Sequence, residues 1–249
     1  MKSPFEFYKK QLPILAVLLL LILAVRSSII EPFRIPTRSM LPGLVTGDFL
    51  FANKMHYGFH IPFSEVFGSP IYLNKTKTPE RGDIIIFTPP EAGQESLYIK
   101  RVVGLPGDKI RFDGKSVILN GVPLRKIEVT GADRDKILNM KGFDPENRYE
   151  KNKLHLFHES LPAPPSATAQ NGEDGKSYLI LEDDSFENTN STQEFNIPDE
   201  HYFVLGDNRD DTRDSRVFGV ISFSSIRAKA LVIWFSWSFQ FDRIGKVIN

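Results

Sequence analysis

The stretch Lys109-Ile-Arg-Phe-Asp-Gly-Lys-Ser-Val-Ile-Leu-Asn-Gly-Val122 sets the fold class of this chain. Two short runs rich in β-branched and aromatic residues, 109–112 and 116–119, are separated by Asp113-Gly114 and followed by Asn120-Gly121. Such dipeptides are favoured in two-residue hairpin turns, because both central residues need a positive φ. The stretch therefore predicts consecutive antiparallel strands joined by tight turns.

Similar runs recur along most of the chain, and no segment shows sustained helical periodicity. The other runs lie at 48–52, 83–87, 97–103, 178–181, 201–205, 216–222 and 228–235. Closely spaced short strands with tight turns are typical of an antiparallel sandwich or barrel. The sequence therefore predicts a mostly β protein built on an antiparallel β-sandwich/barrel domain.

One region departs from this pattern. Residues 125–198 are polar and contain Leu161-Pro-Ala-Pro-Pro-Ser-Ala-Thr-Ala169 and Asn171-Gly-Glu-Asp-Gly175. A segment of this composition buries little apolar surface of its own. We therefore expect an irregular, partly mobile, cap-like subdomain, inserted between a first part of the β-domain at 31–124 and a second part at 199–249.

Hydrophobicity is concentrated near the N-terminus, where Leu12 to Val25 form a charge-free run of fourteen residues. As a helix this run covers about 21 Å, which is short of the ~30 Å hydrocarbon core of a bilayer. Extension through Ile30 gives a spanning length if Arg26 snorkels to the interface. Because Arg26 also stands where a cleavable signal needs a small residue, we expect an uncleaved transmembrane signal anchor at 12–30, rather than a cleaved signal or a buried helix.

The charges beside this run predict its orientation. Lys2, Lys9 and Lys10 precede it against a single acid, Glu6. By the positive-inside rule residues 1–11 are then cytoplasmic and everything after the anchor is extracytoplasmic. The lipid bilayer of the cell membrane is therefore an expected partner of a single-pass protein.

The composition of the 249 residues excludes several classes of function. The chain has 31 Lys+Arg, 31 Asp+Glu and no cysteine. A neutral chain without a basic block is not expected to bind nucleic acid by neutralising phosphates. The absence of cysteine removes disulfides, thiolate-bound metals and thiol catalysis. No pattern requires a metal or an organic cofactor, and none is expected.

Two side chains qualify as reactive groups. Pro36 and Pro42 restrict the backbone on both sides of Ser39 and can hold its hydroxyl in place, although serine and proline are also ordinary loop residues. Lys100 and Arg101 are neighbours in a predicted strand, so one of the two should face inward. A buried lysine has a lowered pKa and is a candidate general base, whereas arginine cannot deprotonate. An edge strand with both cations in water is an equal alternative.

The segment Gly206 to Arg216 contains four Asp and three Arg in eleven residues. A solvated loop or a calcium loop could have this density of carboxylates. The EF-hand pattern fails, because counting from Asp207 puts Arg209 at the third position and Phe218 at the twelfth. Interleaved Asp and Arg favour a network of charge-assisted hydrogen bonds instead.

Together these clusters resemble the sequence boxes of the bacterial signal peptidase I family, whose members are serine proteases with a Ser/Lys dyad. The matching segments are Pro36–Met40, Arg81–Asp83, Tyr98–Gly104 and Gly206–Arg216, within a resemblance over 5–109 and 200–245. It implies a membrane-bound serine endopeptidase that removes signal peptides from exported preproteins after small residues, at Ala-x-Ala type sites. The implied partners are those signal peptides and, as an optional one, the export translocon.

The resemblance also implies roles for individual residues. Ser39 would be the nucleophile and Lys100 the general base. The backbone N–H of Ser39 and the hydroxyl of Thr37 would form the oxyanion hole, and Thr212 would orient the lysine amine. Threonine replaces a more usual serine at both Thr37 and Thr212, which keeps the hydroxyl.

The remaining implied residues support the site or line it. The scaffold of the site would consist of Arg101, as the partner of Asp207, together with Asp214 and Arg216. Apolar pockets for small substrate side chains would be lined by Phe33, Ile35, Met40, Leu44 and Ile99.

Two other interpretations remain open on the residues alone. A Ser-His-Asp hydrolase would use one of His56, His60, His155, His158 or His201, but none lies in a recognisable motif and no Gly-x-Ser-x-Gly elbow is present. A catalytically silent, membrane-tethered binding domain would have no need of both Ser39 and Lys100. The aromatic stretch Trp234–Phe241 favours a final strand with its aromatic face in the core over a patch in the membrane interface.

Overall fold

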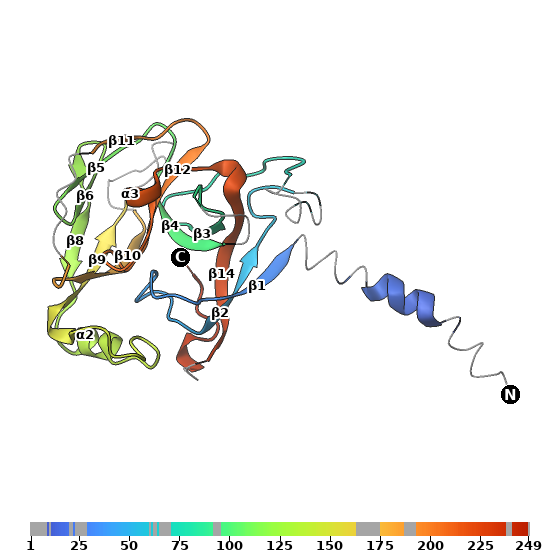
Figure 1. Ribbon diagram of the computed structural model, residues 1–249, viewed down its shortest axis with the longest axis horizontal. Coiled ribbons are helices and arrows are strands. Elements are labelled where there is room, and N and C mark those ends of the chain that lie inside the picture. Colours follow the sequence, from blue (N-terminus) through green and yellow to red (C-terminus); the bar gives the residue numbers. More distant parts are fainter. Residues whose placement is uncertain are drawn as a thin grey trace.

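The protein is described here from a computed structural model that covers residues 9, 11–19, 22, 29–59, 61, 64, 71–91, 96–162, 175–186, 193–237 and 241–248. Within these ranges the chain folds into three antiparallel sheets, shown as a ribbon in Figure 1. The prediction of a mostly β, antiparallel fold is confirmed.

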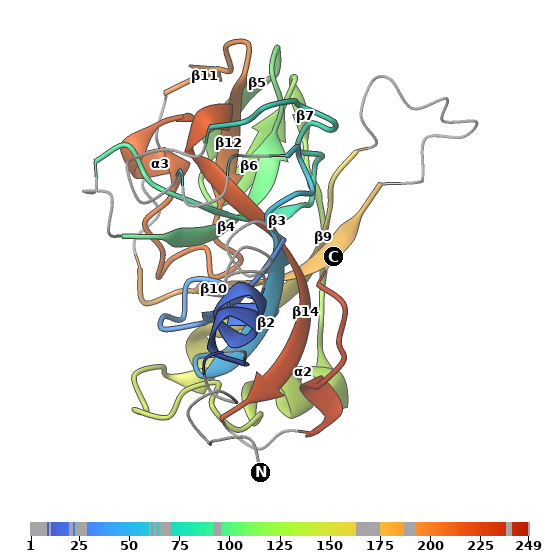
Figure 2. The same ribbon diagram turned by 90° about the vertical axis from the view of Figure 1, so that its right-hand side faces the viewer.

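The largest sheet has seven strands in the order β1-β2-β14-β3-β4-β12-β13. Its strands are β1 (Ile30–Arg34), β2 (Asp48–Asn53), β3 (Ile84–Phe87), β4 (Tyr98–Gly104), β12 (His201–Leu205), β13 (Ile221–Ser222) and β14 (Ile226–Ser236). The sheet is open, with β1 and β13 at its edges, and not a closed barrel. Two register shifts along β14 mark β-bulges, which bend a strand and increase its twist. Figure 2 shows β14 running beside β2, with which it pairs.

The second sheet contains the hairpins expected at 109–122. Its order is β11-β5-β6-β7, formed by β5 (Lys109–Asp113), β6 (Ser116–Leu119), β7 (Val122–Pro123) and β11 (Phe195–Asn196). Gly114, Asn120 and Gly121 have φ values of 57°, 52° and 83°. The second turn is the expected Asn120-Gly121, whereas the first is Gly114-Lys115, because Asp113 still pairs with Ser116. Both predicted hairpins are confirmed.

The third sheet corrects the expectation that 125–198 is irregular. It has the order β10-β9-β8 and consists of β8 (Arg125–Glu128), β9 (Leu154–Ser160) and β10 (Ser177–Asp183), with α2 (Gly131–Leu138) and the 3₁₀ turn η2 (Lys151–Lys153) between β8 and β9. The prediction missed α2 because Leu138 is its only buried side chain, so the helix has no apolar stripe. Residues 163–174 and 187–192 lie outside the described residues.

This inserted segment is ordered because it shares apolar surface with a distant part of the chain. Leu154, Leu156 and Leu181 from its strands pack in one cluster with Leu41 and Val45, which lie between β1 and β2. A composition scan of the segment by itself does not include these partners. A second cluster joins the main sheet to the other two sheets through Val103, Ile110, Ile180 and Phe203.

The remaining elements are short. They are α3 (Ser215–Phe218), η3 (Phe223–Ser225) and η4 (Phe241–Arg243). The C-terminal stretch is a strand only as far as Ser236, and the expectation that its aromatic face lies in the core is wrong for Trp234 and Trp237. Both indoles are exposed, and Trp234 stacks on Phe51 with ring centroids 5.3 Å apart. After the bulges of β14 it is Ser236 that faces inward, where its hydroxyl donates to Asp48 at 2.8 Å.

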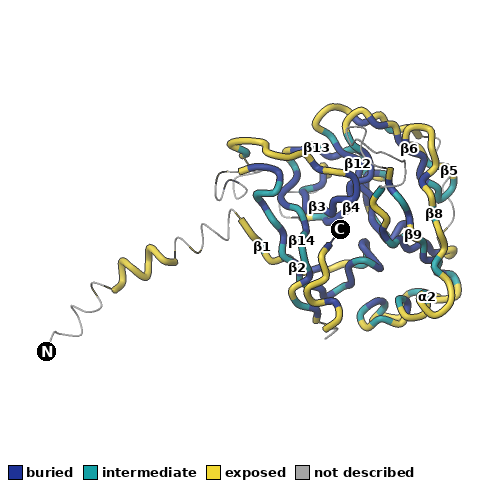
Figure 3. Tube along the Cα trace, turned by 180° about the vertical axis from the view of Figure 1, so that it is seen from behind, coloured by how far each residue is buried: buried dark blue, intermediate teal, exposed yellow. Residues whose placement is uncertain are grey.

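At the N-terminus, residues 11–19 form a helix with exposed side chains, drawn yellow in Figure 3. Residues 20, 21 and 23–28 of the predicted anchor lie outside the described part of the chain. Among the residues that are described, none of the helices has both the length and the apolar character needed to cross a bilayer.

A buried ion pair connects the inserted sheet to the segment after β12. Glu159 on β9 is fully buried and accepts hydrogen bonds from Nη1 of Arg209 at 2.8 Å and from the hydroxyl of Tyr178 at 2.6 Å. Burial of an unpaired carboxylate is far more costly than burial of a paired one. The contact therefore fixes the inserted sheet against the main sheet.

We expect Arg209→Met to lower the free energy of unfolding by about 3–5 kcal/mol, because the Glu159 carboxylate stays buried without its cation. The double variant Arg209→Met/Glu159→Met should recover part of this loss. Urea unfolding followed by tryptophan fluorescence measures both values. A double variant that is less stable than the single one would contradict this account of the pair.

Candidate active site

Ser39 lies in the connection between β1 and β2, and the segment after β12 holds its backbone. The N–H of Asn208 donates to the carbonyl oxygen of Ser39 at 3.2 Å, and Nδ2 of Asn208 donates to the carbonyl oxygen of Arg38, also at 3.2 Å. The N–H of Leu41 closes a turn onto the same Arg38 carbonyl at 2.9 Å. The serine is therefore positioned by backbone contacts from a segment about 170 residues away in sequence.

Gly206 permits this close approach. A Cβ atom at this position would lie 2.6 Å from the carbonyl oxygen of Ser39 and 2.4 Å from Oγ1 of Thr212. Both distances are well below van der Waals contact, so a larger residue would push the serine segment away. Glycine at 206 is a packing requirement of the site.

Lys100 lies on β4, which is flanked by β3 and β12 and is not an edge strand. Its Nζ atom is 2.8 Å from Oγ of Ser39 and 2.9 Å from the carbonyl oxygen of Ile99. Oγ1 of Thr37 lies 3.3 Å from the same Oγ of Ser39. The side chain of Lys100 is buried, so the structure brings a hydroxyl and an amine together away from bulk water.

Burial is the main influence on this amine. It lowers the pKa of Lys100 to about 8, while the carboxylates of Asp214 and Asp207 act in the opposite direction. A lysine with this pKa is neutral in a substantial fraction of molecules at mildly alkaline pH, and a neutral amine can accept a proton. The pair therefore has the composition and geometry of a nucleophile with its base.

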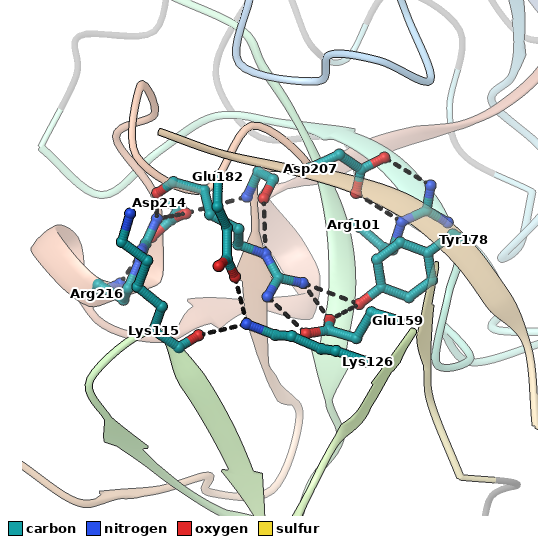
Figure 4. Close-up of polar contacts among 11 residues, drawn as sticks. Arg101, Lys115, Lys126, Glu159, Tyr178, Glu182, Asp207, Asp214 and Arg216 are labelled. Atoms are coloured by element: carbon teal, nitrogen blue, oxygen red, sulfur yellow. Dashed lines mark hydrogen bonds and ion pairs between the residues drawn. The ribbon is translucent and has the colours of Figure 1, made fainter. Parts of the chain in front are cut away.

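Both Lys100 and Arg101 are buried, which corrects the expectation that only one of them would be. The reason is that both faces of β4 are covered. Arg101 donates from Nε and Nη2 to the two carboxylate oxygens of Asp207, each at 2.8 Å, and its guanidinium carbon lies 4.0 Å from the centre of the Tyr178 ring. Figure 4 shows this paired arrangement. Arg101 and Asp207 thus neutralise each other next to the lysine.

A second acid–base pair lies on the other side of the same segment. Asp214 accepts from Nε of Arg216 at 2.9 Å and from the N–H of Gly206 at 3.0 Å, and its carboxylate caps α3 through the N–H of Arg216. Figure 4 labels this pair. The structure therefore brings together the expected pair Arg101 and Asp207, and it also pairs Asp214 with Arg216, the two other expected scaffold residues.

The expected hydrogen bond between Thr212 and the lysine amine is not present. Oγ1 of Thr212 makes no hydrogen bond within the described ranges. The carbonyl oxygen of Ile99 binds Nζ of Lys100 instead. Because this acceptor is a backbone atom, no side-chain motif could have revealed it.

A cavity of about 690 Å³ opens over the serine and the lysine. Its walls are formed by Pro36, Thr37, Arg38, Ser39, Thr46, Leu97, Tyr98, Ile99, Lys100, Glu146, Arg148, Asp210, Asp211, Thr212, Arg213 and Val217. Of the five expected pocket residues, only Ile99 lies on it. Phe33, Ile35, Met40 and Leu44 pack with Ile99 in the core of the main sheet, because the alternation of β1 and the turn after Ser39 point them inward.

None of the described histidines lines this cavity. His155 instead lies between two carboxylates, with Nδ1 3.0 Å from Glu128 and Nε2 3.0 Å from Asp184. His60 lies outside the described residues. Within the described part of the chain, no cluster of three or more His, Asp or Glu residues could hold a metal ion.

A sequence model of the signal peptidase family, peptidase S26, matches residues 8–237. The chain belongs to this family. It is 35 % identical over 236 residues to a protein named signal peptidase I from Rickettsia prowazekii, covering 92 % of this chain and 80 % of that one. A protein of the same name from Rickettsia akari is 34 % identical over 224 residues, which is 86 % of this chain and 74 % of that protein. The chain is therefore an enzyme, a serine endopeptidase.

The comparison with solved structures includes a signal peptidase I from Enterococcus faecalis V583. Its sequence is 26 % identical, and the match covers 62 % of this chain and 98 % of that chain. The TM-score of 0.32 is too low to support a statement about the fold.

Sequence patterns missed the contribution of the inserted segment to the site. Tyr149 accepts a hydrogen bond from Nδ2 of Asn208 at 2.9 Å and donates its own to Asp211 at 2.6 Å. Glu159 and Tyr178 of the same segment accept hydrogen bonds from the guanidinium of Arg209. No local signal marks these residues, since their partners lie between 31 and 62 positions away.

Replacement of Lys100 tests how much its buried amine lowers the free energy of unfolding. The pKa of Lys100 is below its ordinary value, so wild-type stability should rise with pH between about 8 and 10.5. The lowered pKa corresponds to a cost on the order of 3 kcal/mol at pH 7, part of which the hydrogen bonds of Lys100 offset. We expect Lys100→Met to raise the free energy of unfolding by about 1–2 kcal/mol at pH 7.

Urea unfolding of the wild type and of Lys100→Met at pH 7 and at pH 10 measures this effect. The advantage of the variant should shrink at pH 10, which lies well above the folded pKa of Lys100 and close to its unfolded value of 10.5, so protonation favours the unfolded state much less than at pH 7. A variant that is less stable than the wild type at pH 7 would show that the amine does not carry this burial cost.

Proposed function

We propose that this enzyme removes signal peptides from exported preproteins, with Ser39 as the nucleophile and Lys100 as the general base. The observation that carries the proposal is the 2.8 Å separation between Nζ of the buried Lys100 and Oγ of Ser39. A lowered pKa makes this amine a suitable proton acceptor. The family membership supplies the reaction class.

In the first step, neutral Nζ of Lys100 takes the proton of Ser39 while Oγ bonds to the scissile carbonyl carbon. The negative charge moves to the carbonyl oxygen, where the N–H of Ser39 and the hydroxyl of Thr37 are the proposed donors. When the C–N bond breaks, Nζ returns the proton to the leaving amine. Water then attacks the acyl-enzyme and gives one proton to Nζ, which restores Ser39 as the carboxylic acid leaves.

The proposed scaffold residues keep this base usable. Asp207 and Asp214 are close enough to Lys100 to raise its pKa, and an unpaired carboxylate would hold the amine protonated. Each is engaged by an arginine, Arg101 and Arg216 respectively. These pairs weaken the attraction of the acids for the lysine proton, so burial remains the dominant influence on the pKa.

The proposed specificity is for substrates with small side chains before the cut, as in Ala-x-Ala sites. The cavity beside Ser39 has an apolar wall from Leu97, Tyr98, Ile99 and Val217, which would accept short apolar side chains.

We further propose that residues 12–30 anchor the enzyme in the cell membrane, with 1–11 in the cytoplasm and the sheets outside. In the described helix at 11–19, the apolar side chains of Leu12, Leu15 and Leu19 are exposed, as expected of a segment that faces lipid. Ser39 follows Ile30 by nine residues, a tether of at most about 30 Å. Nucleophile and emerging signal peptide would then meet at the outer surface of the bilayer.

Preprotein cleavage by two variants tests the dyad. Ser39→Ala and Lys100→Arg should both abolish turnover, the first because the nucleophile is absent and the second because arginine stays protonated. The measurement is processing of an Ala-x-Ala preprotein in detergent, with circular dichroism to verify folding. Arg111→Lys on β5, outside the cavity, is the matched control for a cation exchange. Substantial activity of folded Lys100→Arg would exclude lysine as the base.

The pH dependence of kcat/KM provides an independent test. Cleavage should increase with pH through an apparent pKa of about 8, because only neutral Lys100 accepts the proton, and should fall about tenfold per pH unit below this. Replacement of the histidines at 56, 60, 155, 158 and 201 by Gln should leave this acidic limb in place. A limb that disappears in the histidine variant would support the Ser-His-Asp mechanism instead.

A further inference from the structure

Arg38 precedes the proposed nucleophile and lines the same cavity. Its side chain is only 10 % exposed, and Nη2 lies 2.9 Å from Oε2 of Glu146. Nε of Arg38 is buried and makes no hydrogen bond to any described residue. A guanidinium has five N–H donors, so this one has donors to spare next to the reacting atoms.

The partner of Arg38 is held much less firmly than Arg38 itself. The side chain of Glu146 is 67 % exposed, and a pair with such an exposed acid contributes little to stability. The backbone around it is nevertheless fixed, because the carboxylate of Asp144 accepts from the N–H groups of Arg148 and Tyr149 at 2.9 Å each. Glu146 is therefore an exposed, weakly paired carboxylate, presented to Arg38 by a hydrogen-bonded loop of the inserted segment.

The same loop brings a second cation to the cavity. Arg148 lines the wall and is exposed, and its guanidinium has no ion-pair partner among the residues that the structure describes. Three acids also line this cavity, and of these Glu146 is the one paired with Arg38, whereas Asp210 pairs with Lys115 and Asp211 accepts from the hydroxyl of Tyr149. Arginine binds carboxylates through paired, charge-assisted hydrogen bonds, more strongly than it binds neutral amides.

The two walls of the cavity differ in polarity, and this difference orients a bound chain. The apolar wall of Leu97 to Ile99 suits the residues before the cut, whereas the loop of Glu146 and Arg148 suits the polar chain that follows it. Because Arg38 is next to Ser39 in sequence, their Cα atoms lie about 3.8 Å apart. The guanidinium can then reach only the residues close to the scissile bond.

We propose that Arg38 and Arg148 form a subsite for a carboxylate side chain at the first or second residue after the cut, an inference that rests on the proposed signal peptide cleavage. In the free enzyme Glu146 occupies this subsite, and an acidic substrate side chain displaces it. The residues determine specificity and take no part in the proton transfers.

The test compares three preproteins that share one signal peptide and one Ala-x-Ala site and carry Glu, Gln or Lys at the second residue after the cut; a second set varies the first residue. The full-length enzyme in detergent micelles should cleave the Glu substrate about 3- to 10-fold faster than the Gln substrate, measured as kcat/KM at low salt. The preference should diminish in 0.5 M NaCl, because one cation is exposed.

Three variants separate recognition from a merely structural role. Arg38→Gln should abolish the preference for Glu, so that the Glu and Gln substrates are cleaved with equal kcat/KM. Glu146→Gln should enlarge the preference, because the competing carboxylate is gone. Arg111→Gln, an equal loss of charge outside the cavity, should leave the preference unchanged.

The outcomes distinguish this subsite from the proposed function. If no preprotein is cleaved, the proposed function itself fails. If all three are cleaved equally at both positions, or if Arg38→Gln slows every substrate by the same factor, the subsite is refuted and Arg38 only tethers the loop of Glu146.

Discussion

A primary amine buried against a hydroxyl is the arrangement on which the rest of this structure depends. Lys100 can stay neutral beside Ser39 only if its amine is largely removed from water and neighbouring charges are neutralised. The amine is buried because β4 lies within the sheet, and the pair meets solvent only through the cavity. Neutralisation comes from arginine–carboxylate pairs, which are placed around the lysine instead of at the protein surface.

These pairs explain why the inserted segment is part of the candidate site. Its strands β9 and β10 supply Glu159 and Tyr178, which hold Arg209, and Tyr178 also covers the guanidinium of Arg101. The main chain of Asn208, adjacent to Arg209, in turn holds the carbonyl of Ser39. The position of Ser39 therefore depends on residues that lie in a separate sheet.

Sequence patterns predicted the parts of this arrangement that are local. The turn dipeptides at 113–114 and 120–121 predicted hairpins because their backbone preferences act over a few residues. The segments around Ser39, Lys100 and Gly206-Asp207 could be singled out because each is contiguous in sequence. The order within the inserted segment was missed because its apolar partners, Leu41 and Val45, are far away in sequence. The acceptor for Lys100 was misassigned to Thr212 because a backbone carbonyl has no sequence signature. Pocket residues such as Met40 were misplaced because a list of apolar residues does not distinguish a core from a cavity wall.

The position of β14 in the main sheet has a consequence for biosynthesis. β2 and β3 do not neighbour each other, and each pairs with β14, which follows all the other strands in sequence. The strand that leads out of the serine segment and the strand beside Lys100 are therefore joined only after β14 has left the ribosome. Until then a nascent chain carries Ser39 and Lys100 without the complete sheet that brings them together, so the candidate site can form only when synthesis of the chain is nearly finished.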